Sequence, residues 1–390
     1  MNQNILQPTV PVPLKNIRNS CYVNAILQTL FRCHKFNNSL QIHFRSTIQN
    51  STNNTNQTSF CHIYRMMYRC FVTKNISLLN QLILQFRKMC KGLGEIEQQD
   101  TGEALSVILK QIHQELIPIT PMFNFNIFHP HIHHSNNNQF DKYLKQQYDK
   151  LYQFDYSLVS KYFSLQTINI IECNICKQKT SKIEKNQQII LSIFDNYVPQ
   201  INKNSGNNTI NGNNTIHCNR NNTINGNNSV YGNNQNENTI NTIDAALKHY
   251  FKPEYVPYCK KCTNCSNKDF GVTIHTFLLG PPIYLVIVLN RFYLDKKTLK
   301  CFKNHKYIDY DDTLCISPFL LKPSINIQYQ LQSVINHQGE IDSGHYYCYQ
   351  KYNNCWYKCN DEHIESTHNN LLTNNDKNDT YILVYEQNTT

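Results

Sequence analysis

The spacing of apolar residues changes once along this chain, and that change constrains the fold more than any other feature. In the first third, apolar residues return every three or four positions, as on one face of a helix. This spacing predicts helices over residues 23–31, 63–71, 78–89 and 104–112. Beyond about residue 163, short runs rich in β-branched and aromatic residues predict strands. These runs are residues 163–173, 181–194, 270–279, 283–292, 325–337, 344–352 and 380–386. Helices first and strands later predict an α+β fold rather than a repeating βαβ fold.

Two segments of biased composition interrupt the chain. The larger, from about Gln200 to Asn241, is rich in Asn, Gly and Thr. Such a composition cannot bury enough apolar surface to order itself, so we expect a disordered surface insert. A shorter stretch that starts at His129 carries several histidines, for which a solvent-exposed loop is favoured over metal binding.

Charge and hydropathy exclude several classes of protein. The net charge is +10, yet no run of basic residues resembles a nucleic-acid-binding arm. No apolar stretch approaches the length of a membrane span, and the N-terminus does not resemble a signal peptide. We therefore expect a soluble protein of the cytoplasm or nucleus, with no nucleic acid or membrane as partner. Its 16 cysteines are then expected to be reduced, as ligands, nucleophiles or core residues.

The stretch "PLKNIRNSCYVNAILQTLF" places Cys21 at the start of the first predicted helix. Unpaired N–H groups and the positive end of the helix dipole favour a thiolate there, which is the nucleophilic form of cysteine. Ser20 or Asn19 is the expected N-cap residue. A buried core cysteine explains the position equally well, so Cys21 alone does not decide the matter.

A reactive thiolate needs an imidazole base, and the best candidate lies near the other end of the chain. In "NHQGEIDSGHYYCY", His345 opens an aromatic strand and follows Gly344, which has no side chain to obstruct a substrate. His337 is a second candidate in the same segment. In "NNCWYKCNDEHI", Asn360 and Asp361 are near enough in sequence for a hairpin to bring one of them beside His345, although either could simply end a strand.

Acyl transfer also needs hydrogen-bond donors for the oxyanion that develops on the carbonyl. Asn16 precedes Cys21 by one short loop, so its amide and the Cys21 N–H could together supply them. Capping of that loop is the alternative role for Asn16.

Two CxxC pairs predict a structural metal site. They are Cys173 with Cys176 and Cys259 with Cys262, and Cys265 forms an overlapping pair with Cys262. Four thiolates make a closed tetrahedral zinc site with no position left for water, so we favour one structural zinc ion per chain over free thiols. The Asn-rich segment between the pairs does not prevent this, because the entropy of loop closure grows only slowly with loop length.

The stretch "EIEQQDTGEALSVILKQI" predicts a helix that starts with a capping box. Asp100 is the expected N-cap, and Glu103 follows three residues later.

Taken together, these segments resemble the ubiquitin-specific protease family, in order through nearly the whole chain. "LKNIRNSCYVNAILQTLF" looks like the family's Cys box, "EQQDTGEAL" like its QQD box, and "SGHYYCY" with "WYKCND" like its His box. "PPIYLVIVLNRF" and "YILVYE" look like its core strands. The resemblance implies a papain-like α+β fold with a helical thumb, a β-rich palm and zinc-bearing β fingers.

The resemblance also implies how the 390 residues are divided. A tail of residues 1–12 precedes a single catalytic domain of residues 13–387. The expected parts of that domain are 13–150, mainly thumb; 151–290, fingers and palm with the insert 200–241; and 291–387, palm with the His box.

By the same resemblance, Cys21 is the nucleophile, His345 the base, Asn360 the third member with Asp361 beside it, and Asn16 an oxyanion donor. The implied reaction is hydrolysis of the bond after the C-terminal glycine of ubiquitin, through a thioester on the cysteine. The implied partners are ubiquitin and ubiquitinated proteins, bound by a monomer that needs no catalytic cofactor.

The resemblance further implies a set of contacts to the C-terminal tail of ubiquitin. The arginines of that tail suit carboxylates at the start of the QQD helix, by charge-assisted hydrogen bonding. A glycine before the histidine suits a channel that admits only a diglycine terminus. The residues implied are Gln98, Asp100, Glu103, Gly344 and Tyr346.

Two departures from the family pattern stand beside the cysteine. The family usually has Gly where this chain has Arg18, and Gly-Leu where Pro13 and Leu14 stand. A residue other than Gly at a position that needs φ > 0 strains the loop that shapes the oxyanion hole. The alternatives are a ubiquitin-binding scaffold with little or no turnover, and a thiol peptidase that acts on another ubiquitin-like modifier or on general peptides.

Overall fold

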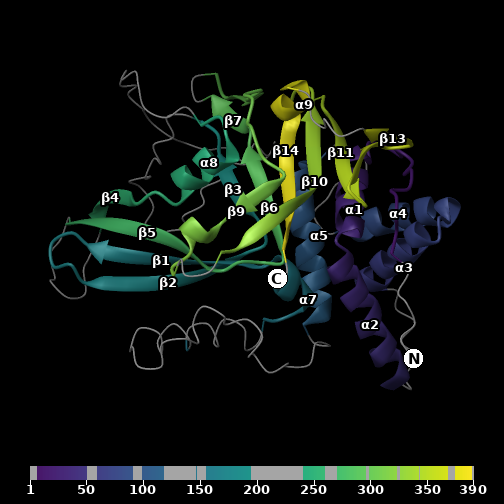
Figure 1. The fold of residues 1–390 in the computed structure, drawn as a ribbon, viewed down its shortest axis with the longest axis horizontal. Coiled ribbons are helices and arrows are strands. Elements are labelled where there is room, and N and C mark those ends of the chain that lie inside the picture. The colour runs from purple at the N-terminus through teal and green to yellow at the C-terminus, as the bar shows by residue number, and fades with distance from the viewer. Residues whose placement is uncertain are drawn as a thin grey trace.

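A computed structural model describes residues 7–50, 59–90, 99–117, 146, 155–194, 240–259, 270–295, 298–322, 326–341, 343–367 and 374–388. Helices from the first third of the chain stand against one face of a large central sheet, and a smaller sheet extends away from them (Figure 1). The prediction of an α+β fold with helices first and strands later is confirmed.

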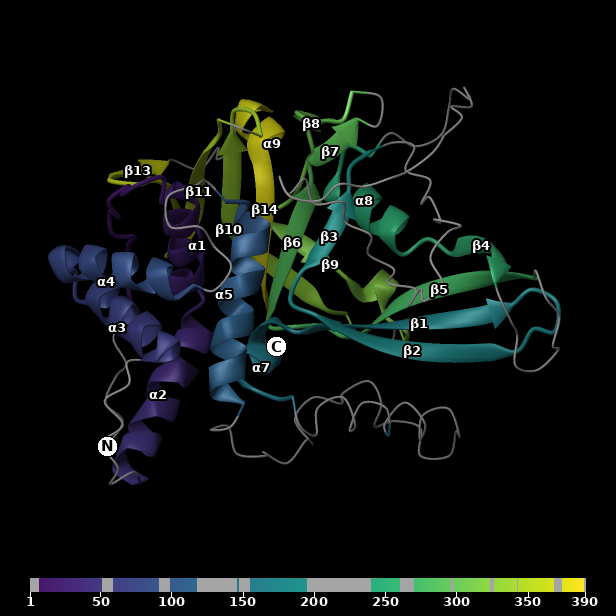
Figure 2. The same ribbon diagram turned by 180° about the vertical axis from the view of Figure 1, so that it is seen from behind.

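The helical layer packs on the face of the central sheet that is nearer the viewer in Figure 2. Its members are α1 (Cys21–Arg32), α2 (His34–Asn50), α3 (Phe60–Val72), α4 (Ile76–Met89), α5 (Thr101–Leu116) and α7 (Leu158–Phe163). All four predicted helices are present. Side chains of Ser59, Asn75, Asp100 and Ser157 cap the starts of α3, α4, α5 and α7 by accepting backbone N–H groups. The sequence patterns did not predict α2.

The central sheet has the strand order β13-β12-β11-β10-β14-β6-β3, with β9 beside β10. Neighbouring strands are antiparallel except β3 and β6. The bounds are β3 (Ile189–Ser192), β6 (Tyr284–Asn290), β9 (Thr313–Cys315), β10 (Gln328–Gln338), β11 (His345–Tyr352), β12 (Cys355–Asn360), β13 (His363–Thr367) and β14 (Thr380–Gln387). The six residues Tyr284–Leu289 of β6 are all buried, because the sheet is covered on both faces.

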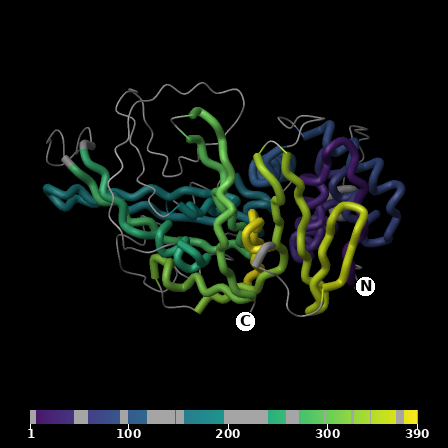
Figure 3. Tube along the Cα trace, turned by 90° about the horizontal axis from the view of Figure 1, so that it is seen from above, coloured from purple at the N-terminus to yellow at the C-terminus, as the bar shows by residue number. Residues whose placement is uncertain are grey.

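The smaller sheet forms the extended arm seen in Figures 1 and 3. Its order is β2-β1-β5-β4, all antiparallel. The bounds are β1 (Leu165–Cys173), β2 (Lys179–Asn186), β4 (Glu254–Cys259) and β5 (Phe270–Gly280). The run of residues 181–194, which looked like one strand, is divided between β2 and β3 and so between the two sheets.

A second core lies under the other face of the central sheet. It contains α8 (Ile243–Tyr250) and the short 3-10 helix η2 (Ser317–Phe319). The hairpin β7 (Phe292–Asp295) with β8 (Lys300–Lys303), and helix α9 (Asn374–Asp379), border the sheet at one end. None of the helices within the described ranges has the length and hydrophobicity needed to cross a membrane. Of the segment 200–241 that was expected to be disordered, residues 200–239 lie outside the described residues, as does the His-rich stretch. Its last two residues are part of the fold, because Ile240 is buried and the Asn241 carbonyl accepts the Asp309 N–H.

Candidate active site

Cys21, His345 and Asn360 come together from three elements. Cys21 is the first residue of α1, His345 opens β11, and Asn360 ends β12. Helix α1 packs against β11, which brings an early and a late segment of the chain side by side (Figure 3). His345 Nε2 lies 2.6 Å from Asn360 Oδ1, and the imidazole also hydrogen-bonds the Cys21 side chain. Since Nε2 is engaged by Asn360, Nδ1 is left for the sulfur.

The pKa of His345 is raised to about 9. The hydrogen bond to Cys21 is the main cause, and the Asn360 amide oxygen and the charges of Cys21 and Asp361 add to it against the opposing effect of burial. The imidazole lies beside the Cys21 side chain, which is only 1% exposed. The three side chains are thus arranged as a nucleophile, its base and the group that orients the base.

Asp361 anchors the loop before Cys21 rather than bonding the imidazole. Its Oδ2 is 3.9 Å from His345 Nε2, beyond hydrogen-bond distance. The same oxygen accepts the Asn16 amide at 2.8 Å, Oδ1 accepts the Asn24 amide at 2.8 Å, and the Asp361 carbonyl accepts Leu14 N–H at 3.0 Å. Asn24 was missed from the sequence. Its signal was a polar residue on the buried face of α1, where it is 2% exposed.

The loop between Asn16 and Cys21 contains two left-handed residues. Arg18 has φ 51° and Asn19 has φ 57°, so the position where the family usually has Gly does need a positive φ. Ser20 is the N-cap residue of α1, but its side chain does not cap the helix. Its hydroxyl instead accepts the Ile17 N–H at 2.8 Å, and its own N–H donates to Asn16 Oδ1 at 3.0 Å.

His337 is not a base for Cys21. It is 3% exposed, and burial lowers its pKa to about 3, with the nearby positive charges adding to the effect. Its ring packs against Phe292 and Tyr346. A Cβ on Gly344 would come within 1.8 Å of His337 Nε2, so the ring of His337 by itself requires glycine at that position.

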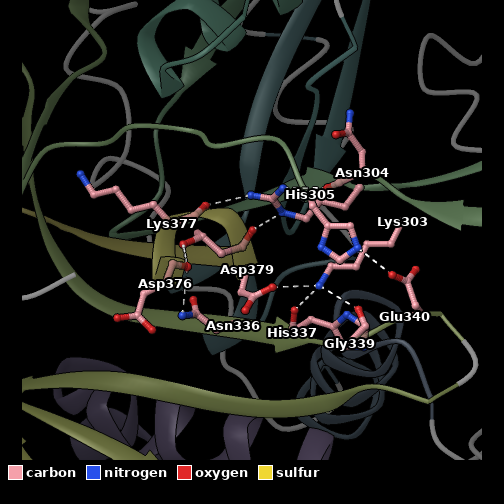
Figure 4. A network of polar contacts seen from close by, with 12 residues as sticks. Lys303, Asn304, His305, Asn336, His337, Gly339, Glu340, Asp376, Lys377 and Asp379 are labelled. Carbon is pink, nitrogen blue, oxygen red and sulfur yellow. Dashed lines mark hydrogen bonds and ion pairs between the residues drawn. The ribbon is translucent and has the colours of Figure 1, made fainter. Parts of the chain in front are cut away.

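A buried lysine holds the loop that leads into His345 (Figure 4). Lys303 ends β8, and its Nζ donates to the carbonyls of His337 and Gly339 and to Asp379 Oδ1, the last two at 3.1 Å. Gly339 has φ 96°, which favours glycine at the start of this loop. His305 also reaches the loop, with its Nε2 2.9 Å from a carboxylate oxygen of Glu340. The loop before the candidate base is therefore tied to β8 and α9.

The residues expected to contact a substrate tail lie in different environments. Asp100 caps α5 by accepting the Glu103 N–H at 2.8 Å, which is half of the predicted capping box, and it also accepts the Tyr381 hydroxyl. Both carboxylates are partly exposed. Tyr346 is only 4% exposed, so its side chain belongs to the core. Gln98 lies outside the described residues.

The first CxxC pair lies at the tip of the smaller sheet. Cys173 ends β1 and Cys176 lies in the turn that follows. Cys259 ends β4, and Cys262 and Cys265 lie outside the described residues. No group of three or more metal-ligating side chains occurs among the residues that the structure describes.

A cysteine at a helix start, hydrogen-bonded to a histidine that an asparagine orients, on an α+β scaffold, defines the papain-like class of thiol hydrolases. Comparison with known sequences identifies the family within that class. The sequence model described as "Ubiquitin carboxyl-terminal hydrolase" matches residues 12–385, so the chain belongs to the ubiquitin carboxyl-terminal hydrolase family.

Curated relatives agree with this assignment. The chain is 31% identical over 155 residues to the probable ubiquitin carboxyl-terminal hydrolase R319 of Acanthamoeba polyphaga mimivirus, covering 37% of this chain and 31% of that protein. It is 21% identical over 385 residues to Usp2 of Drosophila melanogaster, covering 96% of this chain and 34% of the relative. It is 24% identical over 376 residues to ubiquitin carboxyl-terminal hydrolase 11 of Saccharomyces cerevisiae, covering 85% of this chain and 49% of the relative. The chain thus spans half or less of the length of these relatives.

Solved structures show the same fold. Ubp8 of the SAGA DUB module bound to monoubiquitin aligns with a TM-score of 0.67 at 17% identity, over 99% of this chain and 73% of that one. The Ubp8 module bound to ubiquitin aldehyde also aligns with a TM-score of 0.67, at 18% identity, over 100% of this chain and 72% of that one. The papain-like fold expected from the family resemblance is confirmed.

Proposed function

We propose that this protein is a thiol-dependent deubiquitinase that hydrolyses the bond after the C-terminal glycine of ubiquitin. The observation that carries the proposal is the chain of hydrogen bonds from Cys21 to His345 to Asn360, at the start of α1. Membership of the family and the ubiquitin-bound structures of its relatives support ubiquitin as the substrate.

In the first half of the reaction, the Cys21 thiolate attacks the carbonyl carbon of the terminal glycine. The Cys21 N–H and the Asn16 amide are the proposed donors to the oxyanion. As the tetrahedral intermediate collapses, the His345 imidazolium gives its proton to the leaving lysine amine, and a thioester to Cys21 remains. Asn360 keeps the ring oriented throughout.

In the second half, neutral His345 takes a proton from a water molecule, which attacks the thioester carbonyl. Collapse of this second intermediate breaks the carbon–sulfur bond. The products are the carboxylic acid of ubiquitin, which loses its proton to solvent, and the regenerated Cys21 thiolate with protonated His345, so the enzyme returns to its starting state.

We further propose that Asp100 and Glu103 receive the basic residues of the ubiquitin tail. Both carboxylates stand at the start of α5, and both are partly exposed. The second bond of Asp100, from the Tyr381 hydroxyl, fixes the direction of its carboxylate. Tyr346 has its side chain in the core, so a contact to the tail would use its backbone. The predictions of a monomer and of a cytoplasmic or nuclear protein stand as made from the sequence.

We also propose one structural zinc ion at the tip of the small sheet, held by Cys173, Cys176, Cys259 and Cys262. The backbone fits this assignment. Cys173 pairs with Val272 on one side of β5, and Cys259 pairs with Phe270 on the other side, so both cysteines reach the same end of β5. The turn that carries Cys176 is closed by the Lys177 N–H, which donates to the Cys173 carbonyl at 2.9 Å. Bound zinc would supply a cross-link between strands β1 and β4.

A ubiquitin with an electrophile at its C-terminus tests the function directly. We expect a covalent adduct of one ubiquitin on Cys21 in the wild type and none in Cys21→Ala, measured by intact mass. Equivalent probes built on other ubiquitin-like modifiers, and a general peptide substrate, should react poorly. Folded wild type that forms no ubiquitin adduct would refute the proposal, and faster reaction with another modifier would reassign the substrate.

A further inference from the structure

We propose that Arg87 of α4 is a positioning residue that holds the left-handed turn in front of Cys21. The inference rests on the proposed function, because the turn shapes the site at which the oxyanion would form. Its starting point is the departure of this chain from its family, Arg18 in place of glycine, together with the positive φ that Arg18 adopts.

The Arg87 guanidinium is hydrogen-bonded to the backbone of the turn. It is 5% exposed, and it donates from Nη1 to the Ile17 carbonyl at 2.7 Å and from Nη2 to the Arg18 carbonyl at 3.0 Å. The guanidinium carbon also lies 5.7 Å from the ring centroid of Tyr22, the residue after Cys21. Two hydrogen bonds from one rigid, planar group fix orientation as well as distance.

These bonds oppose the strain of the turn. A trans peptide directs its N–H opposite to its C=O, so holding the carbonyls of Ile17 and Arg18 fixes two successive peptide planes. A side chain at position 18 disfavours the left-handed conformation, whereas glycine adopts it without penalty. We infer that Arg87 supplies the restraint that makes this conformation stable with arginine at position 18.

The effect reaches the site through the residues that flank the turn. The turn leads into Ser20, whose N–H donates to Asn16 Oδ1, and Asn16 Nδ2 in turn donates to Asp361. A shift of the turn therefore moves both proposed oxyanion donors, the Asn16 amide and the Cys21 N–H. Those donors act mainly in the transition state, so their displacement lowers kcat more than it raises KM.

The first experiment measures kcat and KM for release of a fluorogenic amine from the C-terminus of ubiquitin. We expect Arg87→Gln to lower kcat by about 10- to 100-fold, the scale of a lost or displaced oxyanion donor. KM should stay within about twofold, because the displaced donors bind the oxyanion only in the transition state. Arg65→Gln is the matched control. Arg65 is also buried, on the neighbouring helix α3, with its guanidinium over Phe44, and this change should leave kcat within about twofold.

The second experiment tests the link to backbone strain. In an Arg18→Gly background the further change Arg87→Gln should lower kcat by only about threefold or less, since glycine needs little restraint. In an Arg18→Ala background the loss should be as large as in wild type, because alanine lacks the Arg18 side chain but keeps the Cβ. A full loss in the glycine background would overturn the proposal. Equal rescue by alanine would do so too, since it would assign the effect to the Arg18 side chain.

Failure of this inference is distinguishable from failure of the proposed function. If wild type is not labelled by the ubiquitin electrophile, the function is wrong. If wild type and Arg87→Gln are labelled at equal rates, the function stands and the role of Arg87 is wrong. Thermal unfolding shows which variants are folded. Should Arg87→Gln not fold, Arg87→Lys keeps the charge with a single donor centre, and an unchanged kcat in that variant would likewise contradict the proposal.

Discussion

Among single residues, His345 has the pKa that most directly controls the proposed chemistry. Its pKa of about 9 keeps the imidazole protonated, and hence able to pair with a thiolate, throughout the neutral range. The rate of the wild type should fall on the alkaline side as pH rises through about 9. Because hydrogen bonding to Cys21 is the largest cause of the raised pKa, Cys21→Ala should lower the pKa of His345 toward its ordinary value.

An NMR titration of the His345 ring in wild type and Cys21→Ala measures both pKa values, and equal values would contradict the assignment. The linked effect on stability has a definite sign. A pKa raised by folding stabilises the protein fully below the unfolded pKa of about 6.5 and loses that contribution as pH rises through about 9. The wild type should therefore lose stability relative to Cys21→Ala over that interval.

Asp361 gives a second prediction at this scale. Its carboxylate accepts the Asn16 and Asn24 amides, and Asn24 is 2% exposed. Asp361→Ala removes the charged partner of a buried amide, so it should lower the free energy of unfolding by about 1–3 kcal/mol. Asn360→Ala is the control, since Asn360 bonds the half-exposed His345 and should matter less for stability. Denaturant unfolding of both variants makes the comparison, and equal losses would contradict the anchoring role.

The sequence allowed His345 to be identified, but it did not reveal the role of Asp361. The residue types that thiol chemistry needs made Cys21, His345 and Asn360 candidates, and the family resemblance chose them over the alternatives. The structure brings all three together. Asp361 was expected beside the base. Its bonds to residues of the opening loop depend on how β12 returns past α1, which no local pattern encodes.

Lys303 sets a prediction at the scale of structural elements. Its side chain is fully buried and joins β8 to the β10–β11 loop and to Asp379 of α9. Lys303→Met leaves these acceptors without their shared cation and should cost about 3–5 kcal/mol of stability. Lys182→Met on the exposed surface of β2 removes the pair with Glu184 and should change stability by less than about 1 kcal/mol. Thermal unfolding of the two variants compares their stabilities, and similar losses of stability would contradict the role of Lys303.

The proposed zinc site gives a prediction about the stability of the small sheet. Metal analysis of purified protein should find one zinc per chain. Cys176→Ser should reduce zinc content and thermal stability together, because the free energy of metal binding is largely free energy of folding. Cys355→Ser, at an exposed cysteine of β12, should change neither quantity. Active protein that is free of zinc would contradict the site.

Helices and strands whose apolar residues recur with a clear period were predicted well from the sequence. Those without such a period were not. The helices α3, α4 and α5 and the strands β5, β6, β11 and β14 match the predicted segments. Helix α2 was missed because its sequence, "HKFNNSLQIHFRSTIQN", is rich in polar residues and offers only a narrow apolar face. The division between β2 and β3 was missed because it depends on which sheet each half joins.

At the scale of the whole molecule, the position of β14 gives a prediction about truncation. This strand, Thr380–Gln387, lies between β10 and β6 in the middle of the central sheet. A chain that ends at residue 379 lacks the strand that joins the two halves of the sheet and exposes two unpaired strand edges. We expect it to aggregate and to fail to react with a ubiquitin electrophile. A truncated chain that stays monomeric by light scattering and still forms the adduct would contradict this.

Because its residues are far apart in the sequence, the candidate site is assembled in a fixed order during synthesis. A ribosome delivers Cys21 long before His345 and Asn360, and the strand that completes their sheet follows them. Contacts so distant in sequence form slowly, and only after most of the chain is available. A growing chain therefore carries its nucleophile, while the intervening residues are made, without the imidazole that would activate it. Hydrolytic competence would appear only once the chain is long enough to complete the fold.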